Sequence, residues 1–164
     1  MQEKFMKEAL KEAQKAYNKE EVPVGAIIVK EGKIIARAHN LKETKTDTTK
    51  HAEILVIQKA SKKLKAWRLN DCEMYITLEP CSMCAGAIIG ARIKKIHIGT
   101  MDPKTGACGS VLNLLEYNFN HKVEVETGIM QKECEYILKD FFKKLRKNST
   151  SQKEDKWKLK KEKS

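Results

Sequence analysis

The stretch from Glu73 to Gly99, EMYITLEPCSMCAGAIIGARIKKIHIG, decides the fold class of this chain. Its first part, Glu73 to Leu78, is mostly apolar and stops at Pro80, which is typical of a buried strand. The segment from Cys81 to Gly90 is rich in Ala and Met and begins directly behind that proline, so a helix is expected there. Lys95 to Gly99 is again typical of a strand. A strand, a helix and a strand in this order predict a parallel crossover.

Comparable patterns on either side of this stretch extend the alternation of helices and strands. Toward the N-terminus, the spacing predicts a helix over about 3–18, a hairpin of strands 24–29 and 33–38, and a helix over 51–63. Toward the C-terminus, we expect a short helix over 111–117, a strand over 122–126 and a last helix over 129–146. Together these elements predict an α/β protein with a mixed five-stranded sheet and helices on both faces.

The composition bounds the class of protein. The chain has 164 residues, of which 41% are hydrophobic, enough for one domain with its own core. No apolar run approaches the roughly 20 residues of a membrane span, and the N-terminus lacks an apolar signal core. The five cysteines are an odd number without a secretion signal, so reduced or metal-bound thiols are expected. We therefore predict a cytoplasmic protein without a membrane partner.

The basic charge is concentrated at the C-terminal end. The net charge is +11, and residues 143–164 hold ten basic and three acidic side chains. We predict a folded domain over 1–147 and a basic, flexible tail over 148–164. One interpretation of the tail is an arm that grips RNA phosphates, with Trp157 stacking on a base. The other is a frayed, solvated end.

Two short motifs carry the candidate chemistry, His51-Ala-Glu53 and Pro80-Cys81-Ser-Met-Cys84. The two cysteines share one face at the expected start of a helix, where the helix dipole favours the thiolate form. His51 begins another expected helix. One histidine and two thiolates leave the fourth position of a tetrahedral zinc ion open, which is typical of catalytic sites. Glu53 is near enough to exchange protons with water at that position without being a ligand.

Each motif alone is weak, since Cys-x-x-Cys also occurs as a buried or redox-active pair. A structural zinc module is the non-enzymatic alternative, and it needs a fourth protein ligand. The candidates are isolated in the sequence: Cys72, Cys108, Cys134, His39, His97 and His121. None of them belongs to a second paired spacing, which favours the catalytic interpretation.

The combination of His-x-Glu with Pro-Cys-x-x-Cys resembles the signature of zinc-dependent nucleobase deaminases. The surrounding text is similar to that of the bacterial tRNA-specific adenosine deaminases, in the cytidine deaminase superfamily. The most similar stretches are Glu21–Ala26, Thr77–Ala87, Asp102–Ala107 and Asp140–Phe142. The resemblance covers about residues 5–146 and implies the three-layer α-β-α fold of that superfamily.

This resemblance implies hydrolytic conversion of adenosine to inosine at the wobble position of a tRNA anticodon stem-loop, with release of ammonia. It implies a homodimer with one Zn²⁺ per subunit. The implied site residues are His51, Cys81 and Cys84 as zinc ligands, Glu53 as general acid and base, Asn40 on the flipped base, and Asp102 and Lys104 along the anticodon backbone. A deaminase of a free base or nucleoside, such as cytidine or guanine, is the alternative because it shares the metal motif.

One departure from the family pattern precedes the histidine. The family usually has Asp-Pro-Thr-Ala at this point, whereas this chain has Asp47-Thr-Thr-Lys50. The change bears on the shape of this loop and adds a positive charge near the site, but it leaves the ligand set intact.

Overall fold

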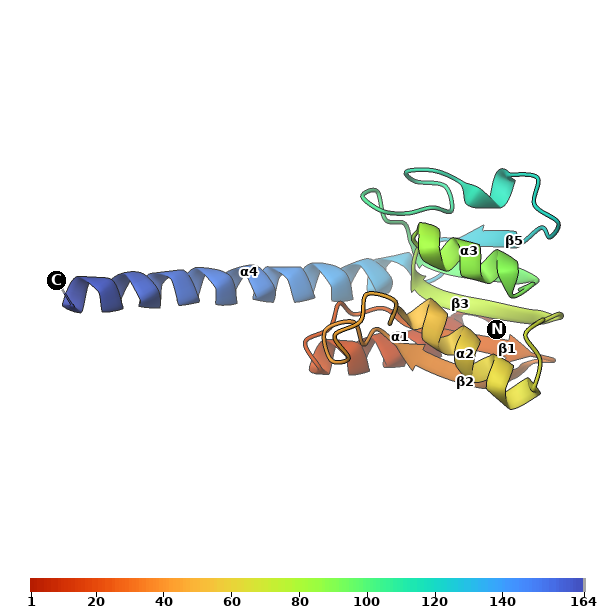
Figure 1. Cartoon of the computed structure of the whole chain (residues 1–164), viewed down its shortest axis with the longest axis horizontal. Helices are drawn as coiled ribbons and strands as arrows, with labels where there is room; N and C mark the ends of the chain where they lie inside the picture. Colours follow the sequence, from red (N-terminus) through yellow and green to blue (C-terminus); the bar gives the residue numbers. More distant parts are fainter. Residues whose placement is uncertain (164) are drawn as a thin grey trace.

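The computed structural model describes residues 1–163, which form a single mixed sheet covered by helices (Figure 1). The strands are β1 (Gly25–Lys30), β2 (Lys33–His39), β3 (Cys72–Leu78), β4 (Lys95–Thr100) and β5 (Glu124–Thr127). Their order across the sheet is β2-β1-β3-β4-β5. Strand β1 runs antiparallel to both of its neighbours, whereas β3, β4 and β5 are parallel. The predicted five-stranded mixed sheet is confirmed.

The helices cover both faces of this sheet. They are α1 (Gln2–Asn18), α2 (Ala52–Leu64), α3 (Ser82–Gly90) and α4 (Gln131–Glu162), with a 3-10 turn η1 (Leu114–Glu116). Helices α2 and α3 pack on one face, and α1 packs with the start of α4 on the other. The three-layer α-β-α arrangement is therefore confirmed. Within residues 1–163, no helix has the length and apolar character needed to cross a bilayer.

Two elements differ from the sequence-based expectation. The short helix expected over 111–117 is only the three-residue turn η1, in which the Asn113 side chain accepts a hydrogen bond from Leu115 N. The last helix was expected to end near Arg146, but α4 continues to Glu162. From Gln152 onward most of the added residues are Lys, Gln, Glu or Leu, which are good helix formers even where no core covers them, whereas residues 148–151 (Asn-Ser-Thr-Ser) have lower helix propensity.

Strand β1 divides the core because its side chains alternate between the two faces. Ala26 and Ile28 point into the larger core under α2 and α3. Ile27 and Val29 point into the smaller core under α1, where Phe5 packs against Tyr75 at 5.2 Å between ring centroids. The two cores together fix the end of the sheet at which the loop before α2 and the loop after β3 lie.

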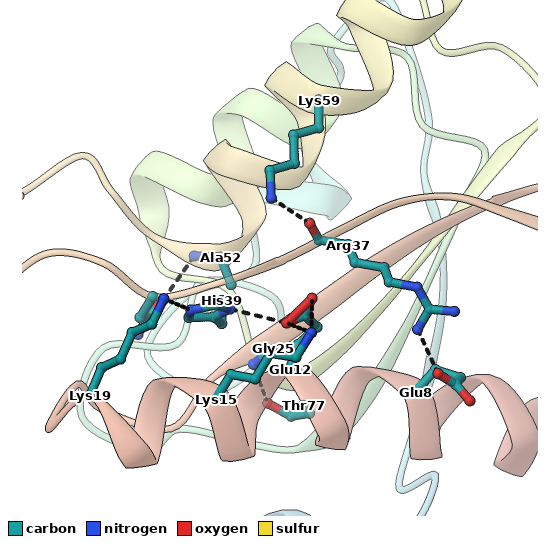
Figure 2. Close-up of polar contacts among 11 residues, drawn as sticks. Glu8, Glu12, Lys15, Lys19, Gly25, Arg37, His39, Ala52, Lys59 and Thr77 are labelled. Carbon is teal, nitrogen blue, oxygen red and sulfur yellow. Dashed lines mark hydrogen bonds and ion pairs between the residues drawn. The ribbon is translucent and has the colours of Figure 1, made fainter. Parts of the chain in front are cut away.

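Helix α1 lies unusually close to β1, and polar contacts fix it there. A Cβ on Gly25 would fall within 3.0 Å of the carbonyl oxygen of Ala9, so only glycine fits. Figure 2 shows Arg37 paired with Glu8, and His39 with its Nδ1 3.0 Å from Oε2 of Glu12. These contacts anchor the end of β2, from which the chain enters the loop that leads to α2.

Candidate active site

The candidate site lies where two helices begin at the same edge of the sheet (Figure 1). His51 is the N-cap residue of α2 and Cys81 is the N-cap residue of α3, each with an extended backbone. Cys84 lies in the first turn of α3, which follows the carboxyl end of β3. Ligands in α/β proteins usually bind at this end of the strands. The two motifs predicted from the sequence are thus brought together.

The three side chains form a compact group of nitrogen and sulfur atoms. The Nδ1 atom of His51 lies 3.7 Å from Sγ of Cys81 and 3.6 Å from Sγ of Cys84. All three candidate ligand atoms lie within 4.8 Å of one another, and within residues 1–163 no fourth His, Cys, Asp or Glu joins them. The group can therefore hold a metal ion with one position left open.

The isolated histidines that a structural zinc module would need are engaged elsewhere. His39 pairs with Glu12. His97 lies on the other face of the sheet, stacked on Tyr75 with 4.1 Å between ring centroids and with its Nε2 3.1 Å from Glu73. The arrangement favours an open metal site over a closed structural one.

Hydrogen bonding within the group shifts the pKa values of the two thiols in opposite directions. The hydrogen bond with Cys84, followed by that with His51, lowers the pKa of Cys81 to about 4. The same contact with Cys81, together with burial, raises the pKa of Cys84. A bound cation would favour the thiolate form of both sulfurs. The positive N-terminal ends of α2 and α3 act in the same direction.

Glu53 lies in the first turn of α2 beside the metal-binding group but outside it. Its side chain is buried, with 4% relative exposure, and it lines a small cavity above the metal-binding group. Desolvation raises the pKa of this carboxyl to about 7. A carboxyl group in this setting can both accept and donate a proton near neutral pH.

A small cavity of about 180 Å³ lies over these residues. Its apolar wall is formed by Val22, Val24 and Leu78. Its polar wall includes Asn40, Lys42, His51, Glu53, Cys81, Asp102 and Thr105. A cavity with one apolar wall and a few convergent polar groups suits a small aromatic group such as a base.

Asn40 lines this cavity and also positions α2. Its Oδ1 accepts a hydrogen bond from the backbone N–H of Ala52 at 2.8 Å, and its Nδ2 donates to the carbonyl oxygen of Val22 at 3.2 Å. The first bond satisfies one of the free N–H groups at the start of α2. Asn40 therefore fixes the helix turn that carries His51 and Glu53.

Asp102 and Lys104, expected to act together, are placed differently. Asp102 lines the cavity, and its Oδ1 accepts the backbone N–H of Lys104 at 3.0 Å. Its Oδ2 accepts a hydrogen bond from the Thr105 hydroxyl at 2.6 Å. Lys104 is exposed on the outside of this loop and is not among the residues that line the cavity. The structure brings Asp102 to the site and leaves Lys104 at its outer rim.

Comparison with known proteins agrees with this geometry. The family model of the MafB19-like deaminases matches residues 1–146. A curated tRNA-specific adenosine deaminase of Bacillus subtilis is 53% identical over 88% of this chain and 91% of its own length. The chain belongs to this deaminase family.

A second curated tRNA-specific adenosine deaminase, from Aquifex aeolicus, is 49% identical over 89% of this chain and 97% of its own length. A solved structure from a study of tRNA:A34 deaminases superimposes on this deaminase with a TM-score of 0.80. It is 42% identical and covers 82% of this chain and 99% of its own.

Sequence reasoning missed two buried carboxylates that line the cavity of this deaminase. Glu79 accepts hydrogen bonds from the backbone N–H groups of Asp102, Cys108 and Ser110, and from the Ser110 hydroxyl. Glu21 accepts hydrogen bonds from the N–H groups of Glu43 and Thr44 and from the Thr44 hydroxyl. Each carboxylate holds one of the two loops that border the cavity. An acidic residue at or near the end of an apolar strand was the available signal, since Glu79 follows β3 directly and Glu21 precedes β1 by a few residues. This signal does not reveal which loop the side chain binds.

The loop that departs from the family pattern is held by its own contacts. Asp47 accepts hydrogen bonds from the N–H and hydroxyl groups of Thr49, and its carboxylate lies 3.9 Å from Nζ of Lys50. The N–H of Leu41 donates to the carbonyl oxygen of Lys50 at 2.9 Å and closes the loop ahead of His51. Lys50 is therefore paired within the loop and does not line the cavity of the deaminase.

Proposed function

We propose that this deaminase acts on tRNA and hydrolyses the adenosine at the wobble position, 34, of the anticodon to inosine with release of ammonia. The observation that carries the proposal is the cavity in which Glu53 lies beside the group of His51, Cys81 and Cys84. The 53% identity to a curated tRNA-specific adenosine deaminase supports adenosine in tRNA as the substrate.

We propose one zinc ion per chain, held by His51, Cys81 and Cys84. A tetrahedral zinc with bonds of about 2.3 Å to sulfur and about 2.0 to 2.1 Å to nitrogen separates the nitrogen from each sulfur by about 3.6 Å. The Nδ1–Sγ distances of 3.7 and 3.6 Å match this value. The donor atoms therefore fit the ion with little rearrangement. When bound, zinc supplies Lewis acidity that makes water a nucleophile at neutral pH.

We propose Glu53 as the residue that moves protons during the reaction. Its carboxyl takes a proton from the attacking water and delivers a proton to the amino nitrogen that leaves C6 of the adenine as ammonia. The buried position of Glu53 in the first turn of α2 supports this role, because it holds the carboxyl at the cavity wall next to the ligands. It also keeps bulk water from competing for the proton.

We propose that Asn40 and Asp102 orient the base and its flanking nucleotides. The contacts of Asn40 with Val22 and Ala52 use one Nδ2 hydrogen and one lone pair of Oδ1, so one donor and one acceptor are left for a base. Asp102 lines the same cavity, and Lys104 on the outer side of its loop is placed to meet the anticodon backbone. Phosphate contacts of this kind position a nucleic acid without reading its sequence.

One assay separates the tRNA substrate from a free base or nucleoside. The enzyme is incubated separately with an anticodon stem-loop that has adenosine at position 34, the same stem-loop with guanosine at 34, free adenosine, cytidine and guanine. Inosine and ammonia are expected only from the first. Turnover of guanine or cytidine with an inert stem-loop would overturn the tRNA assignment while leaving a zinc deaminase in place.

We also propose that the enzyme is a homodimer and works in the cytoplasm, where tRNA is available. Several large apolar side chains are exposed on α3 and on the neighbouring segment around η1: Met83 on the helix, and Val111, Leu112, Tyr117 and Phe119 on the segment. A patch of this kind is typical of a protein interface. Light scattering should give twice the mass of one chain, and Tyr117→Ser with Phe119→Ser should lower it to that of a monomer. A wild-type monomer at micromolar concentration would refute the dimer.

A further inference from the structure

Helix α4 extends far past its last contact with the domain. The ring of Phe141 is buried and lies 5.7 Å from the ring of Tyr17, whose hydroxyl hydrogen-bonds to Asp140. Every side chain from Phe142 to Lys163 is exposed. At 1.5 Å per residue, this part of the helix is about 30 Å long. The family model ends at residue 146, so most of this extension lies outside the part of the chain that the family shares.

The extension carries a dense positive charge. Ten of the residues from 143 to 164 are Lys or Arg and three are acidic. Like charges at this density repel one another on an isolated helix, and no core contact offsets that repulsion beyond Phe141. A polyanion bound along the helix would remove the repulsion.

Five of the ten cationic side chains of residues 143–164 fall on one side of α4, together with the ring of Trp157. At 100° per residue, one third of the helix circumference holds Lys143, Arg146, Lys153, Trp157, Lys160 and Lys161, which we name the basic face. Phe142 and Thr150 lie in the same sector. Trp157 is 60% exposed in the middle of this face, and Nζ of Lys161 lies 4.4 Å from the centroid of its ring. The opposite side of the helix continues from Phe141 through Leu145, Asn148 and Gln152.

The helix leaves the domain from the edge of the sheet where the candidate site lies. In Figure 1, α4 projects from the end of the molecule at which α2 and α3 begin. A groove of about 900 Å³ separates α4 from the end of α1 and from the loop that contains Thr44. Val22 and Glu43 line both this groove and the site cavity. An RNA with one base in the cavity therefore has a path toward the side of α4 that carries Leu145, Asn148 and Gln152, and its backbone reaches the basic face by passing around the helix.

We infer that the basic face of α4 binds the phosphate backbone of the substrate RNA outside the nucleotide that enters the cavity. The identity of this RNA as tRNA rests on the proposed function. Lys and Arg on the basic face replace counterions along the phosphates. Trp157 packs on a ribose or an unpaired base, as aromatic side chains do in other nucleic-acid-binding surfaces.

The distribution of apolar side chains favours RNA over an anionic membrane. A helix that lies on a bilayer has a continuous apolar face opposite its basic face. On α4 the side opposite the basic face carries Asn148, Gln152 and Asp155 between Leu145 and Leu159. The largest apolar side chain, Trp157, lies among the cations instead. This pattern suits RNA, which has closely spaced phosphates for the cations and unpaired bases on which Trp157 can stack.

Two triple variants of the full chain test this inference. The basic-face variant combines Arg146→Gln, Lys153→Gln and Lys160→Gln. The control variant combines Lys156→Gln, Lys158→Gln and Lys163→Gln, which removes the same charge from other sides of the same helix and from its C-cap residue. The affinity for a complete tRNA with adenosine at position 34 is measured by fluorescence anisotropy at several salt concentrations. Circular dichroism checks that α4 stays helical in both.

The basic-face variant should bind at least about tenfold more weakly at low salt, with a slope of log affinity against log salt that is smaller by about two to three. The control variant should change the slope by less than half as much. In a Trp67→Phe background, the fluorescence of Trp157 should change on RNA binding. Inosine formation at saturating RNA should stay at the wild-type rate in both triple variants, because no cavity residue is altered.

If the salt slopes of the two variants are reduced equally, the claim that RNA binds to the basic face in particular is overturned. If both variants keep the wild-type salt slope, any RNA contact of the extension is overturned. Binding of the wild type to phosphatidylserine vesicles, with an RNA slope that neither variant changes, would assign the helix to a membrane and overturn the inference. Failure of the proposed function is a separate result, since it appears as a wild-type enzyme that forms no inosine from this tRNA. The salt slopes then still decide whether the basic face binds RNA.

Discussion

The carboxylate of Glu79 fills the space beside Gly106 that any larger residue would need. A Cβ on Gly106 would lie well under 3.0 Å from the carboxylate carbon and both carboxylate oxygens. Glu79 is buried and binds the backbone of the loop from Asp102 to Ser110. The glycine lets the loop fold tightly around a single charged side chain, and this contact places Asp102 at the cavity.

Replacing Gly106 should therefore disturb the loop and leave the metal site intact. We expect Gly106→Ala to lower the free energy of unfolding by about 1–3 kcal/mol, because the added methyl group displaces Glu79. The KM for the stem-loop should rise, while the zinc content stays at one per chain. Thermal melting, metal analysis and steady-state kinetics measure these effects.

Gly90→Ala is the matched control for this substitution. Nothing lies within 4 Å of a Cβ at Gly90, which is the last residue of α3. This change should be neutral or stabilise the protein by up to about 1 kcal/mol. If Gly106→Ala were as stable and active as Gly90→Ala, the close contact with Glu79 would have no functional weight.

The zinc assignment predicts a sharp difference among the cysteines. Cys81→Ala and Cys84→Ala should each lose most of the bound zinc and all measurable activity, since two protein ligands hold zinc poorly. Cys72→Ala removes a buried thiol outside the metal-binding group and should keep both the zinc content and the activity of the wild type. Metal analysis of the purified variants gives the result. Full zinc content in both Cys81→Ala and Cys84→Ala would refute the ligand set.

A role of Glu53 in proton transfer predicts a loss of rate without a loss of metal. Glu53→Gln keeps the size of the side chain but cannot carry a proton between water and the leaving nitrogen. We expect the rate at saturating stem-loop to fall by at least about 10²–10⁴-fold, with unchanged zinc content and RNA affinity. Glu124→Gln, an exposed change on β5, should leave the rate as it is. A Glu53→Gln enzyme within tenfold of the wild type would exclude this role.

The parts of the fold that sequence predicted well are those with buried apolar patterns. The predicted ends of strands β3 and β4 agree with the structure within about one residue, because the apolar run of β3 stops before Pro80 and that of β4 stops near Gly99. The length of α4 was missed for the opposite reason. Apolar periodicity reports which residues are buried, and beyond Arg146 the helix buries none, so the pattern stops although the helix continues.

The same distinction holds for the candidate site. His51, Glu53, Cys81 and Cys84 lie in two short motifs whose spacing carries the chemistry, so local sequence suffices to propose them. Glu21 binds a loop more than twenty residues away along the chain, and this pairing depends on the tertiary fold. No local spacing encodes such a partner. The boundary of the tail at 147/148 stays a prediction.

Glu21 should make the stability of the protein depend on pH. Its side chain is only 1% exposed. Burial alone would raise the pKa of this carboxyl, but the hydrogen bonds from Thr44 and Glu43 outweigh burial and lower the pKa below its usual 4.5. A carboxyl with a lowered pKa in the folded state stabilises the protein above the unfolded-state pKa. That stabilisation is lost as the pH falls through the folded-state pKa.

Glu21→Gln should therefore cost about 1.5–3 kcal/mol at pH 7, the usual worth of hydrogen bonds to a charged group. The difference from the wild type should shrink as the pH falls through the lowered pKa of the Glu21 carboxyl, because the wild-type carboxyl is then protonated and loses the same bonds. Urea unfolding of both proteins at pH 7 and at several acidic values measures the gap. Glu20→Gln, an exposed neighbour, should stay within about 0.5 kcal/mol of the wild type at every pH. A gap between Glu21→Gln and the wild type that is constant with pH would mean that the charge of Glu21 does not hold the loop.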